Sequence, residues 1–320
     1  MRCAIAILLS VVTAAASAQS NYPSRIVRLI VPSSPGGGTD TTARIVSPKL
    51  SDTLGQQVVV ENRAGASTII GMEAVARSAP DGYTLLIGNS TMTIIPSTHK
   101  ALSVDPVKDF AAVSQLVELP QILVSHPSFP GRTLKDLIAL ARQRPGAIDY
   151  AAGSYGGSGH LAMELLMHMA GLKVTYIPYK SGNAGLTDTL GGQVPLMMGS
   201  VLSILPHVRG GKLRAYGVTS PRRVSTAADI PTLAEGGVPG YQATQWFGIF
   251  APAGTSSDIA RKLHGAIVST LNDAGVRNQL LIDGAEPQPS KTPDEFAQFV
   301  QAEVKKWAYA EPFARSVRLK

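Results

Sequence analysis

Two glycine-rich stretches carry the residue types that can hold an anion. The first is Pro35-Gly36-Gly37-Gly38-Thr39-Asp40, and the second is Gly153-Ser154-Tyr155-Gly156-Gly157-Ser158-Gly159-His160. Each stands between a short apolar run and an amphipathic helix, so its glycines would leave backbone N–H groups uncovered at the positive end of that helix. An anionic oxygen could bind there. Each stretch could instead be a tight turn that needs glycine for close packing, and spacing alone favours neither interpretation.

Motifs for other kinds of site are incomplete. A dinucleotide fingerprint starting at Gly36 would need glycine where Thr41 stands, and no phosphate loop with Gly-Lys-Ser or Gly-Lys-Thr occurs. The 6 histidines lack metal-ligand spacing, and a single cysteine excludes a thiolate metal site. We therefore expect no cofactor and no metal.

Five side chains have more than one interpretation. Ser158 and His160 suggest a nucleophile and its base, but His160 stands where G-x-S-x-G has its last glycine. At a helix start, His160 is expected to bond a turn carbonyl rather than to catalyse. Asp40 could be a general base, although an acid beside a first turn is more often an N-cap. Trp246 and Phe247 could line the floor of a cleft or pack a lobe.

The elements that must position these residues follow one repeated pattern. A short strand, a turn and an amphipathic helix recur, which is typical of a parallel α/β sheet. Capping boxes at 133–136 and 292–295 mark two further helix starts. Strands are expected at 26–31, 58–61, 83–87, 111–118, 121–125, 148–152, 174–178, 194–198, 213–219 and 241–250, and helices at 39–54, 68–77, 160–170, 184–190, 257–272, 276–282 and 292–307.

Two long extended segments indicate that the chain crosses between two lobes. The first crossing joins the runs 111–118 and 121–125 through Leu119-Pro120, and the second is 241–250. Lobe 1 would then comprise residues 19–118 and 241–320, and lobe 2 residues 119–240. The two glycine-rich turns would lie in different lobes and face each other across a cleft.

Residues 1–18 resemble a secretory signal peptide, with Arg2, an apolar run and the cleavage-site form Ala16-Ser17-Ala18. The mature chain would begin at Gln19, outside the cytoplasm. The chain of 320 residues has a net charge of +7 but no block of Lys or Arg interleaved with aromatics, so nucleic acid is not an expected partner. The positive excess favours encounter with anionic solutes.

Several motifs together resemble the Bug family of extracytoplasmic solute receptors, which serve tripartite tricarboxylate transporters. The resemblance runs in order from about Tyr22 to Trp307. The motifs are Ile30-Val31-Pro32, Pro35-Gly36-Gly37-Gly38-Thr39-Asp40, Glu61-Asn62-Arg63 with Gly65, Pro80-Asp81-Gly82-Tyr83-Thr84-Leu85, Gly159-His160-Leu161, Pro178-Tyr179-Lys180, Gly191-Gly192-Gln193-Val194 and Pro231-Thr232-Leu233-Ala234-Glu235.

The resemblance implies an α/β periplasmic-binding-protein fold of the Venus flytrap kind, type II-like, in which two lobes close about two crossing strands. It also implies that one carboxylate of a small ligand is held by a loop from each lobe. The implied ligand-binding residues are Gly36, Gly37, Gly38, Thr39 and Asp40 in the first loop, Gly153, Tyr155, Gly156, Ser158 and His160 in the second, and Asn89, Ser90, Ser181, Asn183, Gly199 and Ser200 elsewhere.

The function implied is delivery of a mono- or dicarboxylate, an amino acid or an aromatic acid to the membrane subunits of such a transporter. We expect a periplasmic, monomeric protein without enzymatic activity. A receptor that signals to a membrane sensor is one alternative. A secreted hydrolase using Ser158 and His160 is another, which the incomplete nucleophile motif disfavours. Three departures from the family pattern limit the transfer of roles: residues 64–68, the variant turn containing Tyr155, and the tail after Trp307.

Overall fold

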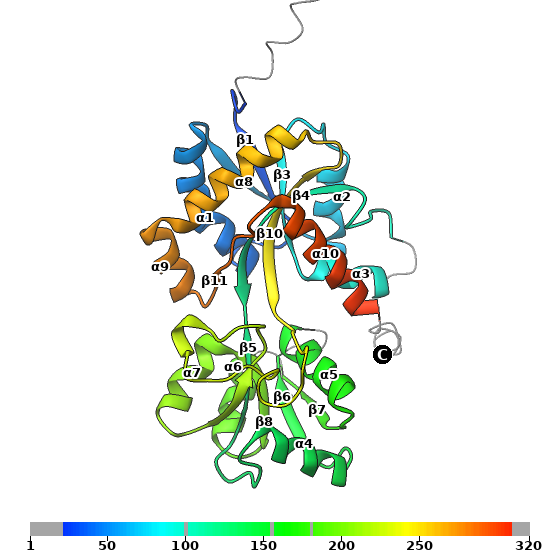
Figure 1. The fold of residues 1–320 in the computed structure, drawn as a ribbon, viewed down its shortest axis with the longest axis vertical. Coiled ribbons are helices and arrows are strands. Elements are labelled where there is room, and N and C mark those ends of the chain that lie inside the picture. Colours follow the sequence, from blue (N-terminus) through cyan, green and yellow to red (C-terminus); the bar gives the residue numbers. More distant parts are fainter. Residues whose placement is uncertain (1–21, 99–101, 154–156, 180–181, 309–320) are drawn as a thin grey trace, which may run out of the picture.

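The computed structural model describes residues 22–98, 102–153, 157–179 and 182–308. Two β-sheets, each covered by helices on both faces, stack along the long axis of the molecule (Figure 1). We call the part built on the six-stranded sheet lobe 1 and the part built on the five-stranded sheet lobe 2. The predicted signal peptide, residues 1–18, lies outside the described residues.

Lobe 1 contains both the first and the last described elements of the chain. Its sheet has the strand order β11-β4-β10-β3-β1-β2. Its elements are β1 (Val27–Val31), α1 (Gly38–Leu54), β2 (Val58–Asn62), α2 (Ile69–Ala76), β3 (Thr84–Asn89), α3 (Thr91–Thr98), β4 (Phe110–Leu119), β10 (Gln245–Pro252), α8 (Ser257–Asn272), α9 (Ala274–Ile282), β11 (Glu286–Pro287) and α10 (Pro293–Trp307), with a 3₁₀ turn at Ala66–Thr68.

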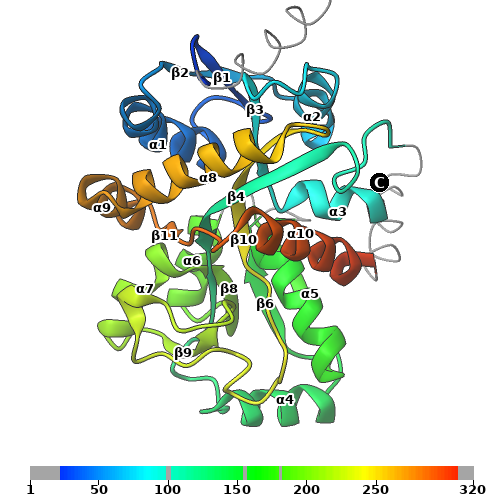
Figure 2. The same ribbon diagram turned by 45° about the horizontal axis from the view of Figure 1, so that its top comes forward.

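Lobe 2 is formed by the middle of the chain, and its sheet has the strand order β7-β6-β8-β5-β9. Its elements are β5 (Gln121–Ser125), α4 (Leu134–Gln143), β6 (Asp149–Ala152), α5 (Ser158–Ala170), β7 (Thr175–Pro178), α6 (Gly182–Leu190), β8 (Leu196–Ser200), α7 (Val201–Arg209) and β9 (Arg214–Val218), with a 3₁₀ turn at Ser225–Ala227. Figures 1 and 2 show β4, β5 and β10 running between the lobes.

Each sheet is buried on both faces, which explains the continuous apolar runs in its strands. In β1, for example, Leu29 belongs to a buried cluster with residues of α1, α8 and α9, whereas its neighbour Ile30 belongs to a second cluster with residues of α2, α3 and α10. In lobe 2, α4 and α5 cover one face and α6 and α7 cover the other. α1, α2 and α3 follow the parallel strands β1, β2 and β3 and begin at one edge of the lobe 1 sheet, whereas α8 follows the antiparallel β10 and begins at the other edge.

The repeated strand-turn-helix pattern predicts parallel sheets, but both sheets are mixed. β1, β2 and β3 are parallel, but β10 runs antiparallel to both β3 and β4, and β5 runs antiparallel to β8 and β9. A strand that arrives from the other lobe enters the sheet from the opposite end, which imposes this direction. The strand predicted at 241–250 begins only at Gln245.

Both predicted capping boxes open helices. The Thr133 side chain accepts the Asp136 N–H while Asp136 accepts the Thr133 N–H, and the Thr292 side chain accepts the Glu295 N–H. α3 and α7 were not predicted from the sequence. Each contains an internal proline, Pro96 or Pro206, and each follows its strand with almost no intervening loop, so the usual boundary signals are absent.

Candidate functional site

Strand register places the two glycine-rich turns at edges of the sheets that face the opposite lobe. β10 enters lobe 1 from lobe 2, and its early residue Phe247 is paired with Asn89 at the end of antiparallel β3. The carboxyl ends of β3 and of its parallel neighbour β1 therefore point toward lobe 2. In lobe 2, Gln121 at the start of β5 pairs with Ser200 at the end of β8, so β8 and parallel β6 end toward lobe 1.

The first turn leads into α1 through a glycine N-cap. Gly37 is the N-cap residue, its φ of −77° and ψ of 162° are extended, and no side chain caps the helix there. The first intrahelical bond runs from the Thr41 N–H to the Gly37 carbonyl. The N–H groups of the three residues before Thr41 therefore have no acceptor within the helix. Gly36, Gly37 and Gly38 are all exposed.

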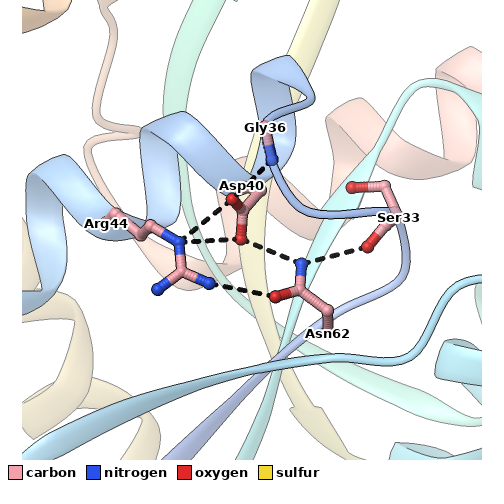
Figure 3. A network of polar contacts seen from close by, with 5 residues as sticks. All are labelled: Ser33, Gly36, Asp40, Arg44 and Asn62. Atoms are coloured by element: carbon pink, nitrogen blue, oxygen red, sulfur yellow. Dashed lines mark hydrogen bonds and ion pairs between the residues drawn. The ribbon is translucent and has the colours of Figure 1, made fainter.

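The carboxylate of Asp40 supports this turn from inside (Figure 3). One oxygen accepts the Gly36 N–H at 2.9 Å, the other accepts Asn62 Nδ2 at 2.9 Å, and Arg44 Nε lies 3.0 and 3.1 Å from the two oxygens. Asn62 in turn donates to the Ser33 carbonyl and accepts from Arg44 Nη2, each at 3.0 Å. The network joins the turn, the first helix and the end of β2 into one unit.

Asp40 is not the N-cap that the sequence analysis favoured. It lies two residues inside the helix and reaches back to the turn, because the extended Gly37 supplies the N-cap position. Burial works to raise the pKa of Asp40, but the hydrogen bonds from Arg44, Gly36 and Asn62 outweigh burial and lower its pKa. Asp40 is therefore ionised at neutral pH and fully engaged, which does not suit a general base.

The second turn leads into α5 with the same backbone arrangement. Gly157 is an extended N-cap with φ of −72° and ψ of 169°, and the Leu161 N–H donates to the Gly157 carbonyl. The N–H groups of Ser158, Gly159 and His160 again precede the first intrahelical bond. Gly159 packs closely on the sheet, since a Cβ there would lie 2.5 Å from the Met198 carbonyl oxygen. Here glycine serves close packing as well as an open helix end.

His160 belongs to a buried cluster beneath the second turn. Its ring lies 4.5 Å from that of Tyr176, and Tyr176 donates a hydrogen bond to the Gly153 carbonyl at 2.5 Å. Nε2 of His160 lies 3.5 Å from Glu164 Oε1. Burial lowers the pKa of His160 from 6.5 to about 4, and burial raises the pKa of Glu164, against a hydrogen bond from Tyr150. His160 is consequently neutral at neutral pH.

The other predicted residues of lobe 1 join the first turn. Asn89, at the end of β3, donates from Nδ2 to Thr39 Oγ1 at 3.4 Å and accepts the Thr91 N–H at 3.0 Å. The Ser90 N–H donates to the Trp246 carbonyl. Asn89 and Ser90 are buried, so the structure brings them to the base of the turn rather than to its exposed rim.

The other predicted residues of lobe 2 lie around the second turn. A Cβ on Gly153 would be 3.5 Å from the Gly182 nitrogen, so β6 ends beside the start of α6, where Asn183 is exposed. Gly199 and Ser200 end β8, with Ser200 exposed as the N-cap of α7. Tyr155, Gly156 and Ser181 lie outside the described residues. Among the described residues, no hydrogen bond or ion pair joins the lobe 1 group to the lobe 2 group.

Trp246 and Phe247 point to opposite faces of β10. Trp246 is fully buried and packs the aromatic cluster of lobe 1, where the rings of Phe296 and Phe299 lie 5.7 and 5.5 Å away. Phe247 lies under the first turn, since its Cζ is 3.5 Å from the position of a Cβ on Gly38. Trp246 therefore packs the lobe, whereas Phe247 forms the base of the glycine turn.

Three residues of this region were not among the predicted site residues. Arg44 and Asn62 hold Asp40, and Ser33 has a buried hydroxyl with no hydrogen-bond partner among the described residues. The hydroxyl lies 3.9 Å from the position of a Cβ on Gly37. Asn62 falls in the family motif Glu61-Asn62-Arg63, so that motif was an available signal. Arg44, one helical turn after Asp40, could have been found from the spacing typical of helix ion pairs.

Neither a metal site nor a membrane-spanning helix is found in the part of the chain that the structure describes. No three side chains of His, Cys, Asp and Glu gather as metal ligands would. Across the same residues, none of the helices combines the length and apolarity needed to span a membrane.

Comparison with known proteins gives a family match and close relatives. Residues 42–310 match the model of the tripartite tricarboxylate transporter family receptor. The chain is 37% identical over 297 residues to Protein BugT of Bordetella pertussis, covering 92% of this chain and 91% of BugT. The family predicted from the sequence motifs is thereby confirmed.

Two solved structures with bound ligands resemble this chain along most of its length. An R. palustris protein solved with adipate has 34% identity and a TM-score of 0.69, covering 92% of this chain and 98% of its own. MatC from Rhodopseudomonas palustris, solved with bound malate, has 32% identity and a TM-score of 0.67, covering 91% and 100%. The structure of the periplasmic binding protein BugD is also similar, with 32% identity and a TM-score of 0.66 over 92% of this chain and 98% of its own, and these likenesses confirm the predicted two-lobe α/β fold.

Proposed function

The chain belongs to the tripartite tricarboxylate transporter receptor family, and from this membership we propose that it captures a small carboxylate between its lobes and delivers it to the membrane subunits of such a transporter. The ligand would be a mono- or dicarboxylate, an amino acid or an aromatic acid. Two relatives of known structure hold dicarboxylates, adipate in one and malate in the other.

The observation that carries the proposal is the matched pair of glycine N-caps. α1 and α5 both begin after an extended glycine without a capping side chain, and both begin at the sheet edge that faces the other lobe. Each offers three N–H groups and the positive end of a helix dipole. A carboxylate placed between them would satisfy donors from both lobes at once, which gives ligand binding a direct way to close the lobes.

Hydrogen bonds from helix ends can account for useful affinity without an arginine. A hydrogen bond to a charged group contributes about 1.5–3 kcal/mol. Three or four of them offset much of the roughly 4–15 kcal/mol that association costs. A dissociation constant near micromolar, about −8 kcal/mol, is then within reach. Water is excluded as the lobes close, which strengthens each contact because the local dielectric constant falls.

The remaining assignments follow from the same proposal. Ligand contacts are assigned to the two turns, Tyr155 and Gly156 included, and to Asn89, Ser90, Ser181, Asn183, Gly199 and Ser200. Lobe boundaries at residues 119 and 241 let β4, β5 and β10 act as the hinge. The protein acts as a monomer in the periplasm after loss of residues 1–18, and an intact mass beginning at Gln19 tests that cleavage.

The test removes single N–H groups without disturbing the helices. Gly38 and Ser158 are the first residues of α1 and α5, a position where proline is well tolerated. The extended Gly37 and Gly157 before them also suit a following proline. Gly38→Pro and Ser158→Pro should each weaken binding of adipate or malate about ten-fold, the equivalent of one hydrogen bond of about 1.4 kcal/mol.

Matched controls separate the N–H group from the side chain. Gly38→Ala and Ser158→Ala keep the N–H and should retain most of the affinity in calorimetry, with circular dichroism confirming the fold. A prior thermal-shift screen of carboxylates, with ATP and Zn²⁺ as negative controls, identifies the best ligand. Wild-type affinity in both folded proline variants, or a shift with ATP or Zn²⁺ alone, would contradict the proposal.

A further inference from the structure

The crossing strands divide each sheet into two sides. In lobe 1, β3, β1 and β2 lie on one side of β4 and β10, and only β11 lies on the other. In lobe 2, β8, β6 and β7 lie on one side of β5, and only β9 lies on the other. The glycine turns follow strands of the first side. β11 and the end of β9 are therefore across the hinge from the candidate site.

The lobes touch on this far side. Ser225, which follows β9, donates from Oγ to the Glu286 carboxylate of β11, with 2.9 Å to each oxygen. Nearby, Leu202 of α7 in lobe 2 lies against Gly284 of lobe 1, where a Cβ would be 2.9 Å from the Leu202 Cβ. Leu202 and Gly284 line a cavity of about 210 Å³ together with Pro120 and Glu286.

On the side of the hinge that carries the glycine turns, the described residues of the two lobes are not in contact through hydrogen bonds. Gly36, Gly37, Gly38 and Ser200 are exposed, and no described hydrogen bond links the two turns. The structure thus has its interlobe contact on the far side of the hinge and open surfaces on the near side. Rotation about the crossing strands that brings the turns together must separate β11 from Ser225, because the two sides lie on opposite sides of the pivot.

We propose that the Ser225–Glu286 hydrogen bonds and the Leu202–Gly284 contact hold the lobes apart, so that this far-side contact sets the ligand affinity although it touches no ligand. The inference rests on the proposed function. Any free energy that favours the open form reduces the fraction of protein ready to close, and the dissociation constant rises by the inverse of that fraction. Weakening the contact therefore tightens binding.

A gain in ligand affinity on removing the contact distinguishes this proposal from a purely structural role, which predicts a loss or no change. Ser225 is exposed, and its side chain makes no other described hydrogen bond, so Ser225→Ala leaves the core of lobe 2 intact. Adipate and malate serve as probes, because relatives of known structure hold them. Calorimetry should show two- to five-fold tighter binding for Ser225→Ala, and a similar gain for Leu202→Ala, a residue that is 47% exposed.

A double-mutant cycle assigns the gain to the contact itself. In a Glu286→Ala background, Ser225→Ala should add nothing, since its partner is already absent. Ser128→Ala is the matched control: an exposed serine of lobe 2 whose hydrogen bond to His126 stays within that lobe. Its affinity should equal that of the wild type.

Small-angle X-ray scattering of the ligand-free variants gives a readout that does not depend on ligand. Ser225→Ala and Leu202→Ala should each have a smaller radius of gyration than the wild type, because the closed form is more populated. Unchanged or weaker affinity together with an unchanged radius in folded variants would overturn the inference. Failure of the wild type to bind any carboxylate would instead overturn the proposed function, and the scattering comparison would still decide this one.

Discussion

The helix ends of α1 and α5 share one backbone design and differ in what supports it. Each has an extended glycine N-cap and three N–H groups without an intrahelical acceptor. Two residues inside α1 stands the ionised Asp40, held by Arg44 and Asn62, whereas the same place in α5 holds the neutral His160, packed on Tyr176. The proposed binding depends on the backbone arrangement that the two helix ends share. The side chains that hold this arrangement in place differ between the lobes.

The difference also concerns charge near the ligand. Asp40 uses the Gly36 N–H for an internal carboxylate, and Arg44 balances its charge. The second turn is supported without a described ionised group in contact with its backbone, since Tyr176 holds the Gly153 carbonyl. In the proposed complex, a ligand carboxylate would therefore meet a polar, charge-balanced turn on one side and a turn with a largely apolar support on the other.

The largest expected effect compares the glycines after the two N-caps. Gly159→Ala would place a Cβ 2.5 Å from the Met198 carbonyl oxygen, where backbone must shift, so it should cost about 3 kcal/mol of stability. Gly38→Ala would place its Cβ 3.5 Å from the Phe247 ring, an ordinary contact, and should change stability by less than about 0.5 kcal/mol. Urea denaturation measures both, and equal losses would show that the two turns pack alike.

A second prediction breaks the support of α1. Asp40→Ala leaves the Gly36 N–H, Asn62 and Arg44 without their charged acceptor, and should lower the free energy of unfolding by about 2 kcal/mol. Asp40→Asn keeps one acceptor oxygen and should lose about half as much. Asp52→Ala, at an exposed position of the same helix, is the control and should stay within about 0.5 kcal/mol. A loss in the control as large as that of Asp40→Ala would refute the network's role.

Much of the fold was predictable because its signals are local. The capping box at Thr133 and the apolar runs before each turn depend on neighbouring residues, and both predicted their elements. The N-cap of α1 was mistaken because three consecutive glycines permit several helix starts, and the choice depends on where Asp40 finds Arg44 and Asn62. The direction of β10 depends on the lobe from which it arrives.

Within the candidate site, the backbone donors were predictable and their support was not. Glycine runs before helices identify open helix ends by composition alone. The contacts beneath them join residues far apart in sequence, such as Asn62 with Ser33, and Tyr176 with Gly153. The same applies across the hinge, where Ser225 meets Glu286 without any local pattern in either segment.

The smallest effect concerns pH and distinguishes the two lobes. Burial lowers the pKa of His160 to about 4 from an ordinary 6.5, so the unfolded chain binds a proton between those pH values while the folded protein does not. The contribution of His160 to the free energy of unfolding therefore falls as the pH falls from 6.5 to 4, by about 3 kcal/mol at most. Glu164 acts in the opposite direction, because its raised pKa makes the folded protein bind a proton more readily.

We accordingly expect a net loss of about 1–2 kcal/mol between pH 6.5 and 4.5, measured by urea denaturation and absent from His160→Gln. The lowered pKa of Asp40 acts in another window, because its contribution is lost only as the pH falls below the ordinary value of 3.8. Lobe 2 should therefore weaken first on acidification. If the free energy of unfolding of the wild type and of His160→Gln changed with pH in the same way, the prediction would be contradicted. The support of α5 by His160 would then be no more sensitive to acid than the support of α1 by Asp40.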